Sequence, residues 1–214
     1  MKYAVDEIKR EVRIVLDNNM TSTVLTGLQD VDTLSIDDLI ESKISDAARL
    51  IESDAPSYLL DSGEPFSDTI GWKEAIGIGS GWIRLPDDFL RLVSFQMSDW
   101  SRPTSKVITD DDPEYAMQSS RYPGIRGCPQ KPIVAIVQWP VGLVLEFYSC
   151  TQGTNVYVKK ARYIPMPKIE DENIVLCEKL KPAIIYYTAY MVAASLQSKD
   201  LAESMLNQSK ELMK

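Results

Sequence analysis

Carboxylates are the side chains that could carry chemistry in this sequence, because the 214-residue chain contains no histidine. This absence removes the commonest general base, the commonest metal ligand and every Ser–His or Cys–His triad. Two carboxylates can hydrolyse a glycosidic bond without histidine, and Glu146, inside an apolar strand pattern, is the best candidate for a perturbed acid. Strand alternation places Glu146 on the other face of the sheet from Leu145 and Phe147, so we expect its side chain on a solvated face. The sequence therefore predicts that the protein is not an enzyme.

Two clusters of aspartates are candidates for metal binding. Mg²⁺ and Ca²⁺ need several oxygen ligands that converge from separated positions, whereas adjacent acids on an extended chain point apart. Asp110–Asp112 precede Pro113 and fit the start of a helix, where negative charge is favourable. Asp87–Asp88 follow Pro86 and fit a turn. We therefore predict no metal site and no cofactor.

The glycine and cysteine patterns add no nucleotide-binding or zinc signature. Gly77–Gly81 lacks the third glycine of a dinucleotide-binding motif and the Gly–Lys–Ser/Thr of a phosphate-binding loop, and a strand follows it. We therefore predict a flexible hairpin there. Cys128, Cys150 and Cys177 are widely spaced and odd in number, which predicts reduced thiols rather than disulfides or a structural zinc site.

The charge of the chain is unevenly distributed. The net charge is −8, and residues 1–68 carry 15 Asp+Glu against 6 Lys+Arg, whereas the remainder carries 16 against 17. An acidic N-terminal third repels polyanions, and in Lys159–Lys160–Arg162 alternation sends neighbouring bases to opposite faces. These patterns disfavour a nucleic-acid-binding module. Because no apolar run is long enough for a membrane span and no signal peptide is apparent, we expect a soluble intracellular protein.

Hydrophobic spacing predicts an α+β protein of one domain, in which a helical part packs with a small antiparallel β-sheet or sandwich. Residues 1–56 are typical of two amphipathic helices, 57–165 of short strands, and 172–214 of two further helices. An insertion at 98–130 should hold a short helix that starts near Pro113. The expected strands are Lys73–Ile78, Trp82–Leu85, Arg91–Gln96, Ile133–Gln138, Leu143–Tyr148 and Asn155–Tyr163.

The N-terminal helices are expected at residues 3–18 and from Ser35 to just before Pro56, with a loop at 20–34 between them. Ser35 is a suitable N-cap, and Asp38 three residues later completes a capping-box pattern.

The C-terminal helices contain the predicted subunit contacts. Asn173–Leu180 indicates a short turn or helix, and Pro182 either starts the next helix or kinks it. Residues 183–197 are apolar almost all round, which a small sheet cannot cover and which favours a neighbouring subunit. Tyr186 and Tyr190 share one helix face and indicate packing rather than a ligand pocket. The predicted contact residues are Ile184, Tyr187, Met191, Leu201, Met205 and Leu212.

The line WIRLPDDFLRLVSF (Trp82–Phe95) indicates two short strands joined by a proline–acid corner, with no side chain placed to act on a substrate. The segments SRPTSKV, YPGIRGCPQKPIVAIV and LKPAIIYYTAYMVAASLQSKDLAESML follow in that order. With two amphipathic helices in front, this order of parts resembles the head-to-tail adaptor (connector or ring) proteins of tailed bacteriophages, especially podovirus-like ones. The resemblance extends from about residue 3 to 213. The loop at 20–34 and the larger 98–130 insertion depart from the family pattern.

The resemblance implies a structural virion protein without catalytic residues. It implies a homo-oligomeric ring, commonly of twelve copies, that binds the portal protein and the next tail or ring protein. DNA would pass through its channel without specific binding, and the protein would reside at the head–tail junction after assembly in the host cytoplasm. Two alternatives stay open: another neck or tail-completion protein, and a carboxylate-dependent hydrolase that uses Glu146 or Asp87–Asp88.

Overall fold

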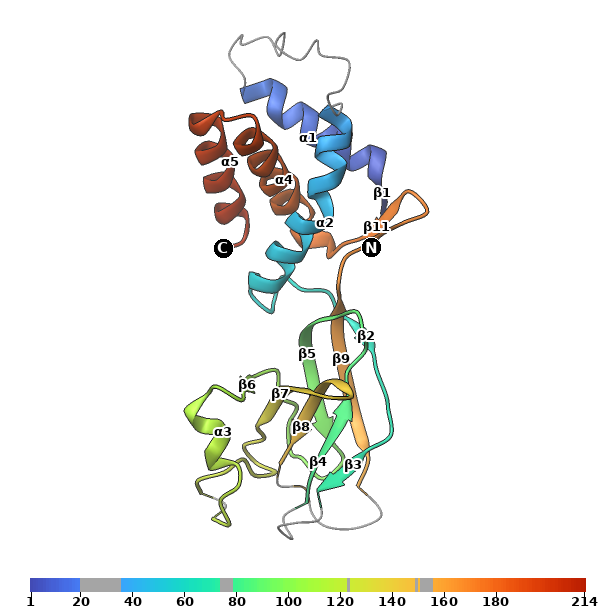
Figure 1. Cartoon of the computed structure of the whole chain (residues 1–214), viewed down its shortest axis with the longest axis vertical. Helices are drawn as coiled ribbons and strands as arrows, with labels where there is room; N and C mark the ends of the chain where they lie inside the picture. The colour runs from blue at the N-terminus through green and yellow to red at the C-terminus, as the bar shows by residue number, and fades with distance from the viewer. Residues whose placement is uncertain (20–35, 74–78, 123, 149, 151–155) are drawn as a thin grey trace. The chain divides into compact units, whose positions relative to one another are not determined.

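The computed structural model describes residues 1–19, 36–73, 79–122, 124–148, 150 and 156–214 (Figure 1). The chain divides into two compact units: a helical unit, Met1–Asp61 with Met166–Lys214, and a β unit, Ser62–Pro165. Among the described residues, helices account for 37% and strands for 29%, which confirms the α+β class. The sequence predicts one domain; in the structure its two terminal helical parts share one unit, and its β-rich part forms the other.

The helical unit is built around one apolar helix. α4 packs against α1, α2 and α5, which explains why it is apolar almost all round: it is the central helix of its own unit. Pro182 lies in the first turn of α4 and therefore starts this helix rather than kinking it. The predicted helices are confirmed as α1 (Val5–Asn19), α2 (Ile36–Asp54), α4 (Lys181–Ser195) and α5 (Lys199–Leu212).

The outer helices bury the faces that their spacing predicts. The apolar positions of α1 recur every three to four residues and face inward, and α2 ends shortly before Pro56, whose ring disfavours a helical residue before it. Each fully buried Ile or Val contributes roughly 1.5–3 kcal/mol relative to an exposed one. The buried residues are Val5, Ile8, Val12 and Leu16 of α1 and Ile40, Ile44, Ala47, Ala48 and Ile51 of α2. The predicted loop at 20–34 and the Ser35 N-cap lie outside the described residues.

A small antiparallel sheet completes the helical unit and was not expected from the sequence. Its order is β1 (Lys2–Ala4), β11 (Asn173–Val175) and β10 (Ile169–Glu170). The prediction of a turn or helix over Asn173–Leu180 is therefore wrong for β11 and correct only for a short 3₁₀ helix, Glu178–Leu180. Strands this short carry little periodicity, and β11 exists because a segment distant in sequence, β1, pairs with it.

The β unit consists of two sheets around a common core. One sheet has the order β2 (Glu64–Pro65), β9 (Val158–Pro165), β5 (Phe89–Met97). The other has the order β3 (Gly71–Lys73), β4 (Ser80–Arg84), β8 (Gly142–Phe147), β7 (Val134–Trp139), β6 (Val107–Thr109), and only its β6–β7 pair is parallel. Phe95 of the first sheet and Phe147 of the second stack with ring centroids 6.0 Å apart. This contact joins the two sheets in one hydrophobic core.

The proline–acid corner connects the two sheets. β4 and β5 flank the corner as predicted, but they do not pair with each other: β4 pairs with β8, and β5 pairs with β9. Leu85 and Leu92 are buried in the common core, and Phe89 packs against it. The predicted strands are confirmed at β4, β5, β7, β8 and β9; residues 74–78 of the first predicted strand lie outside the described part.

The insertion contains the predicted short helix, α3 (Pro113–Met117), with Pro113 in its first turn. Part of the predicted Gly77–Gly81 hairpin lies outside the described residues. Within the rest, Gly79 has φ +61°, and a Cβ there would lie 1.8 Å from the carbonyl oxygen of Cys150, so a glycine is required. No helix in the described ranges is long and apolar enough to cross a membrane.

Candidate functional site

Glu146 is buried, not solvated as the sequence led us to expect. It lies on β8 with 1% of its surface exposed. Alternation does place Glu146 opposite Leu145 and Phe147, but the second face of the sheet is covered as well. A second apolar cluster forms there, and Tyr115 of α3 packs against it. The prediction was wrong because the insertion turns the expected outer face into an interior.

The carboxylate of Glu146 is the centre of a polar cluster from three elements and the end of β8. Lys73 of β3 forms an ion pair with Oε2 at 2.8 Å. The hydroxyls of Tyr148 and Tyr115 donate hydrogen bonds to the same oxygen at 2.7 Å and 3.2 Å. The Lys73 ammonium also lies 5.5 Å from the ring centroid of Trp139. Among the described residues, Oε1 has no hydrogen-bond partner.

The electrostatics of this cluster keep both tyrosines protonated. Burial, followed by the hydrogen bond to Glu146 and its charge, raises the pKa of Tyr148 far above its ordinary value. Burial and the charge of Glu146 likewise raise the pKa of Tyr115. Two neutral hydroxyls and one ammonium thus solvate a buried carboxylate. The arrangement ties α3, β3 and β8 together, and it gives a substrate no exposed carboxylate oxygen to approach.

The aspartates of the proline–acid corner have separate partners. Asp87 forms an ion pair with Arg84 at 2.8 Å, whereas Asp88 accepts a hydrogen bond from the Tyr163 hydroxyl at 3.0 Å. Burial and Asp88 raise the pKa of Tyr163 to about 12. The two carboxylates therefore do not converge on one point. No group of three potential metal ligands occurs among the described residues.

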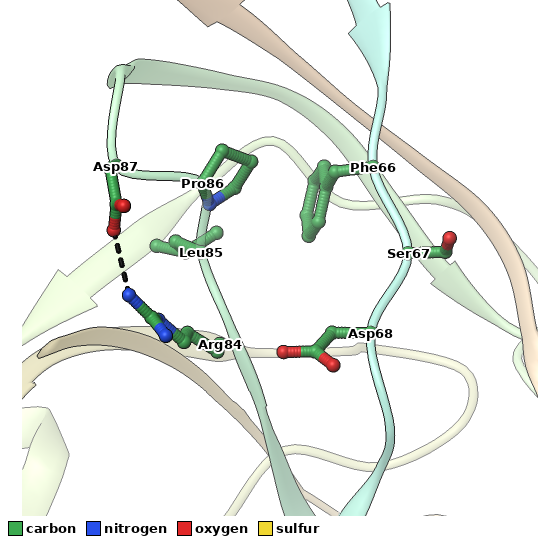
Figure 2. A pocket seen from close by; sticks show the side chains of 7 residues that line it. All are labelled: Phe66, Ser67, Asp68, Arg84, Leu85, Pro86 and Asp87. Carbon is green, nitrogen blue, oxygen red and sulfur yellow. Dashed lines mark hydrogen bonds and ion pairs between the residues drawn. The ribbon is translucent and has the colours of Figure 1, made fainter. Parts of the chain in front are cut away.

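A pocket of about 250 Å³ lies beside this corner. Figure 2 shows Phe66, Ser67 and Asp68 on one side of it and the corner residues Arg84–Asp87 on the other, with the Asp68 carboxylate directed toward Arg84. Asp68 also accepts a hydrogen bond from the Thr69 amide at 2.6 Å. The pocket combines an aromatic wall with an ion-paired rim. It contains no nucleophile paired with a base, so it could hold a small polar group but does not form a catalytic set.

The third acid cluster, Asp110–Asp112, is exposed and precedes α3 as predicted. Asp112 occupies the N-cap position but makes no side-chain capping hydrogen bond. The nearest ion pair joins Lys106 and Glu114 at 3.4 Å. This cluster is therefore a solvated helix start.

The helical unit has its own polar cluster and an apolar pocket between α1 and α4. Lys181 forms ion pairs with Glu7 at 2.6 Å and with Glu11 at 2.8 Å, and its ammonium lies 4.5 Å from the ring centroid of Tyr3. The pocket beside it encloses about 270 Å³, and Tyr186 contributes to its lining. Tyr190, which shares a helix face with Tyr186, instead packs against Tyr187, with their ring centroids 5.2 Å apart.

The predicted contact residues divide into two groups. Ile184 and Met205 are buried in the helical unit itself, so they pack in its core and are removed from the candidate interface. The correction follows from the central position of α4, whose apolar surface is covered by its own chain. The remaining residues, Tyr187, Met191, Leu201 and Leu212, are partly or fully exposed and stay predicted contacts.

The sequence analysis missed Lys73, Tyr115 and Tyr148, which surround Glu146. It also missed Glu52, which is buried in α2 and accepts a hydrogen bond from the Cys177 amide at 2.8 Å. Burial raises the pKa of Glu52 and raises that of the Cys177 thiol to about 12. A carboxylate on an otherwise buried stripe was the available signal in both cases. Tyr115 and Cys177 lie 31 and 125 positions from the carboxylates that they contact, so spacing does not reveal them. Tyr148 is only two positions from Glu146, and strand alternation places both on one face.

No protein-family model matches this chain, and no curated protein sequence matches it either.

Proposed function

We propose that the chain is a structural adaptor of a tailed-bacteriophage virion, which assembles into a ring between the portal protein and the next tail or ring protein. The resemblance of the sequence to the adaptor family suggests this role. One observation carries it further: the chain consists of two compact units with very different charge. The helical unit holds 12 Lys+Arg against 20 Asp+Glu, a net charge of −8, and the β unit holds 11 of each.

Unequal units supply what a ring requires. A cyclic assembly of more than two copies joins two different faces of neighbouring subunits. An acidic unit and a neutral unit offer such different faces, and both expose large apolar side chains, including Leu50 on the helical unit and Tyr122 on the β unit. Exposed apolar side chains beside charged groups are common at protein–protein interfaces. The acidic helical unit also disfavours adhesion of DNA, whose phosphates bind to cations.

The chemistry of the buried groups supports a structural role. Glu146 forms an ion pair and hydrogen bonds with side chains of its own unit, and Asp88 accepts a hydrogen bond from Tyr163. A hydrolase that relied on Glu146 would need substrate access to a carboxylate that is 1% exposed. The burial of Glu146 therefore favours the structural proposal over the hydrolase alternative.

Mass photometry of the purified chain, alone and with the portal protein of the same virus, tests the proposal. We expect a ring-sized species that contains many copies and binds the portal, and we expect the protein in purified virions. A chain that stays monomeric with the portal and is missing from virions would contradict the proposal. A chain that binds only a tail component would instead identify another neck or tail-completion protein.

A further inference from the structure

The last residue of α3 and the segment that follows it form a basic and apolar surface on the β unit. We call this surface the tip and define it by Met117, Arg121, Tyr122, Ile125 and Arg126. Tyr122 is 71% exposed and Ile125 is 53% exposed, and Met117 is exposed as well. Tyr, Met and Arg are the residue types that protein interfaces enrich. The tip is therefore a candidate docking surface.

A buried glutamine links α3 to the residue that follows the tip. The Gln118 side chain donates a hydrogen bond to the carbonyl oxygen of Glu114 at 2.8 Å and accepts one from the Gly127 amide at 2.9 Å. The amide of Ile125 donates to the carbonyl oxygen of Tyr122 at 3.0 Å. These hydrogen bonds constrain the described residues of the tip, which lowers the entropic cost of binding a partner.

The tip contains bases and no acid of its own. From Tyr115 to Leu145 the sequence contains three bases, Arg121, Arg126 and Lys131, and no acid. Nε and Nη1 of Arg126 are buried and have no hydrogen-bond partner within the described residues. A partner that carries carboxylates would balance these cations.

The helical unit offers an acidic and apolar surface on α2, which we call the acceptor face. Asp46, Leu50 and Asp54 are four residues apart and share one stripe of the helix, and all three are exposed. Asp46 also forms an ion pair with the exposed Arg49 at 3.4 Å, so the acidic character of the face centres on Asp54. Tyr187 extends this face onto α4, which packs against α2. Burial, followed by the charges of Tyr190 and Asp54, raises the pKa of Tyr187.

We propose that the tip of one copy docks on the acceptor face of a second copy. The inference rests on the proposed ring function, for which it names the contact between subunits. Arg121 would face the carboxylate of Asp54, and Tyr122 would pack on Leu50. The two surfaces differ, so each docked copy keeps one free tip or one free acceptor face, and the contact continues around a ring rather than closing at a dimer.

The composition of the tip favours a protein partner over a nucleic acid. Non-specific DNA binding draws on about 6–10 phosphate contacts in strong cases, whereas the tip has two arginines. Its three apolar side chains have no role against phosphates. Asp110–Asp112 also precede α3 and would repel DNA near the tip.

Sedimentation velocity of the full chain, from about 1 µM to about 1 mM, measures this contact across weak and strong affinities. We expect the wild type to self-associate. Arg121→Glu and Asp54→Lys should each raise the dissociation constant by about tenfold, because each places like charges opposite one another. A mixture of the two variants should recover association, since a negative tip then meets a positive acceptor face.

Lys159→Glu provides the matched control, because it reverses an exposed base of the β unit outside the tip. It should leave association unchanged, and circular dichroism should show that all three variants fold. The inference is overturned if the wild type stays monomeric at about 1 mM, if Lys159→Glu weakens association as much as Arg121→Glu does, or if the mixture fails to associate.

Three further outcomes separate this inference from its alternatives. If Arg121→Glu lowers binding to a DNA duplex and leaves self-association intact, the tip contacts nucleic acid and the inference is wrong. If the wild type enters virions and binds the portal while Arg121→Glu assembles equally well, the docking contact is wrong and the adaptor function stands. Absence of the wild type from virions counts against the adaptor function alone.

Discussion

The helical unit and the β unit differ in their net charge and in where their charged side chains lie. The helical unit carries the whole net charge of −8, and its ion pairs, such as Lys181 with Glu7 and Arg13 with Asp37, are at least partly solvated. The β unit is neutral overall, yet it buries the carboxylate of Glu146 under α3. Solvated charges contribute little to stability but define a surface, whereas a buried carboxylate makes its partners indispensable. The ion pairs of the helical unit therefore lie mainly at its surface, with Glu52 as a buried carboxylate beside them, whereas the buried carboxylate of the β unit holds α3, β3 and β8 together.

The largest expected effect is a loss of stability in the β unit that leaves the core of the helical unit unchanged. Phe147→Ala removes a ring that joins both sheets of the β unit, and we expect a loss of about 3–5 kcal/mol in that unit's unfolding free energy. All four tryptophans, at positions 72, 82, 100 and 139, belong to the β unit, so guanidinium unfolding followed by tryptophan fluorescence reports it selectively. Circular dichroism at the helical minimum mainly reports the other unit. Equal shifts in both signals would contradict separate cores.

The next prediction concerns the buried carboxylate. Lys73→Met removes the ammonium that faces Glu146, and the uncompensated carboxylate should cost the β unit about 2 kcal/mol, less than a fully buried pair because Lys73 is partly exposed. Lys106→Met provides the control. It removes the exposed ion pair with Glu114 and should cost less than about 0.5 kcal/mol. Tryptophan fluorescence measures both, and equal costs would show that Glu146 does not depend on its partner.

A smaller effect is expected from Glu52, a buried carboxylate of the helical unit whose pKa is raised by burial. A raised pKa means that the folded unit binds the proton more tightly than the unfolded chain does, so stability falls as pH rises above about 4.5. Glu52→Gln keeps an oxygen for the Cys177 amide and removes the charge. Thermal unfolding followed by circular dichroism at pH 5 and pH 7.5 should show that the variant gains stability relative to the wild type at the higher pH. Glu203→Gln, at an exposed position of α5, is the matched control.

The smallest effect appears at alkaline pH in the β unit. Tyr163 has a pKa of about 12 because of burial and Asp88, above the ordinary value of 10.0. The stability it contributes is complete below pH 10 and declines as pH rises toward 12. Tyr163→Phe should therefore reduce the alkaline loss of stability seen by tryptophan fluorescence between pH 10 and pH 12. An unchanged pH profile would show that Tyr163 does not couple to unfolding.

Local patterns predicted most of the helices and strands, because the spacing of apolar residues in each of them is contained within one segment of the chain. The buried stripe of α2 and the strands β4, β5, β7, β8 and β9 follow from spacing alone. The sheet of β1, β10 and β11 did not follow, because strands of two or three residues have too few positions to show a period. Pairing across the length of the chain stabilises them.

The sequence by itself determined the α+β class, the position of each long element and the lack of histidine chemistry, because these depend on residue types and on spacing along the chain. Tertiary structure alone decided which apolar faces stay exposed. The sequence predicted a subunit interface at residues 183–197, but α1, α2 and α5 cover this helix. It also predicted a solvated Glu146, but α3 covers that side chain. Burial depends on what other segments lie above a surface, and spacing within one segment does not contain that information.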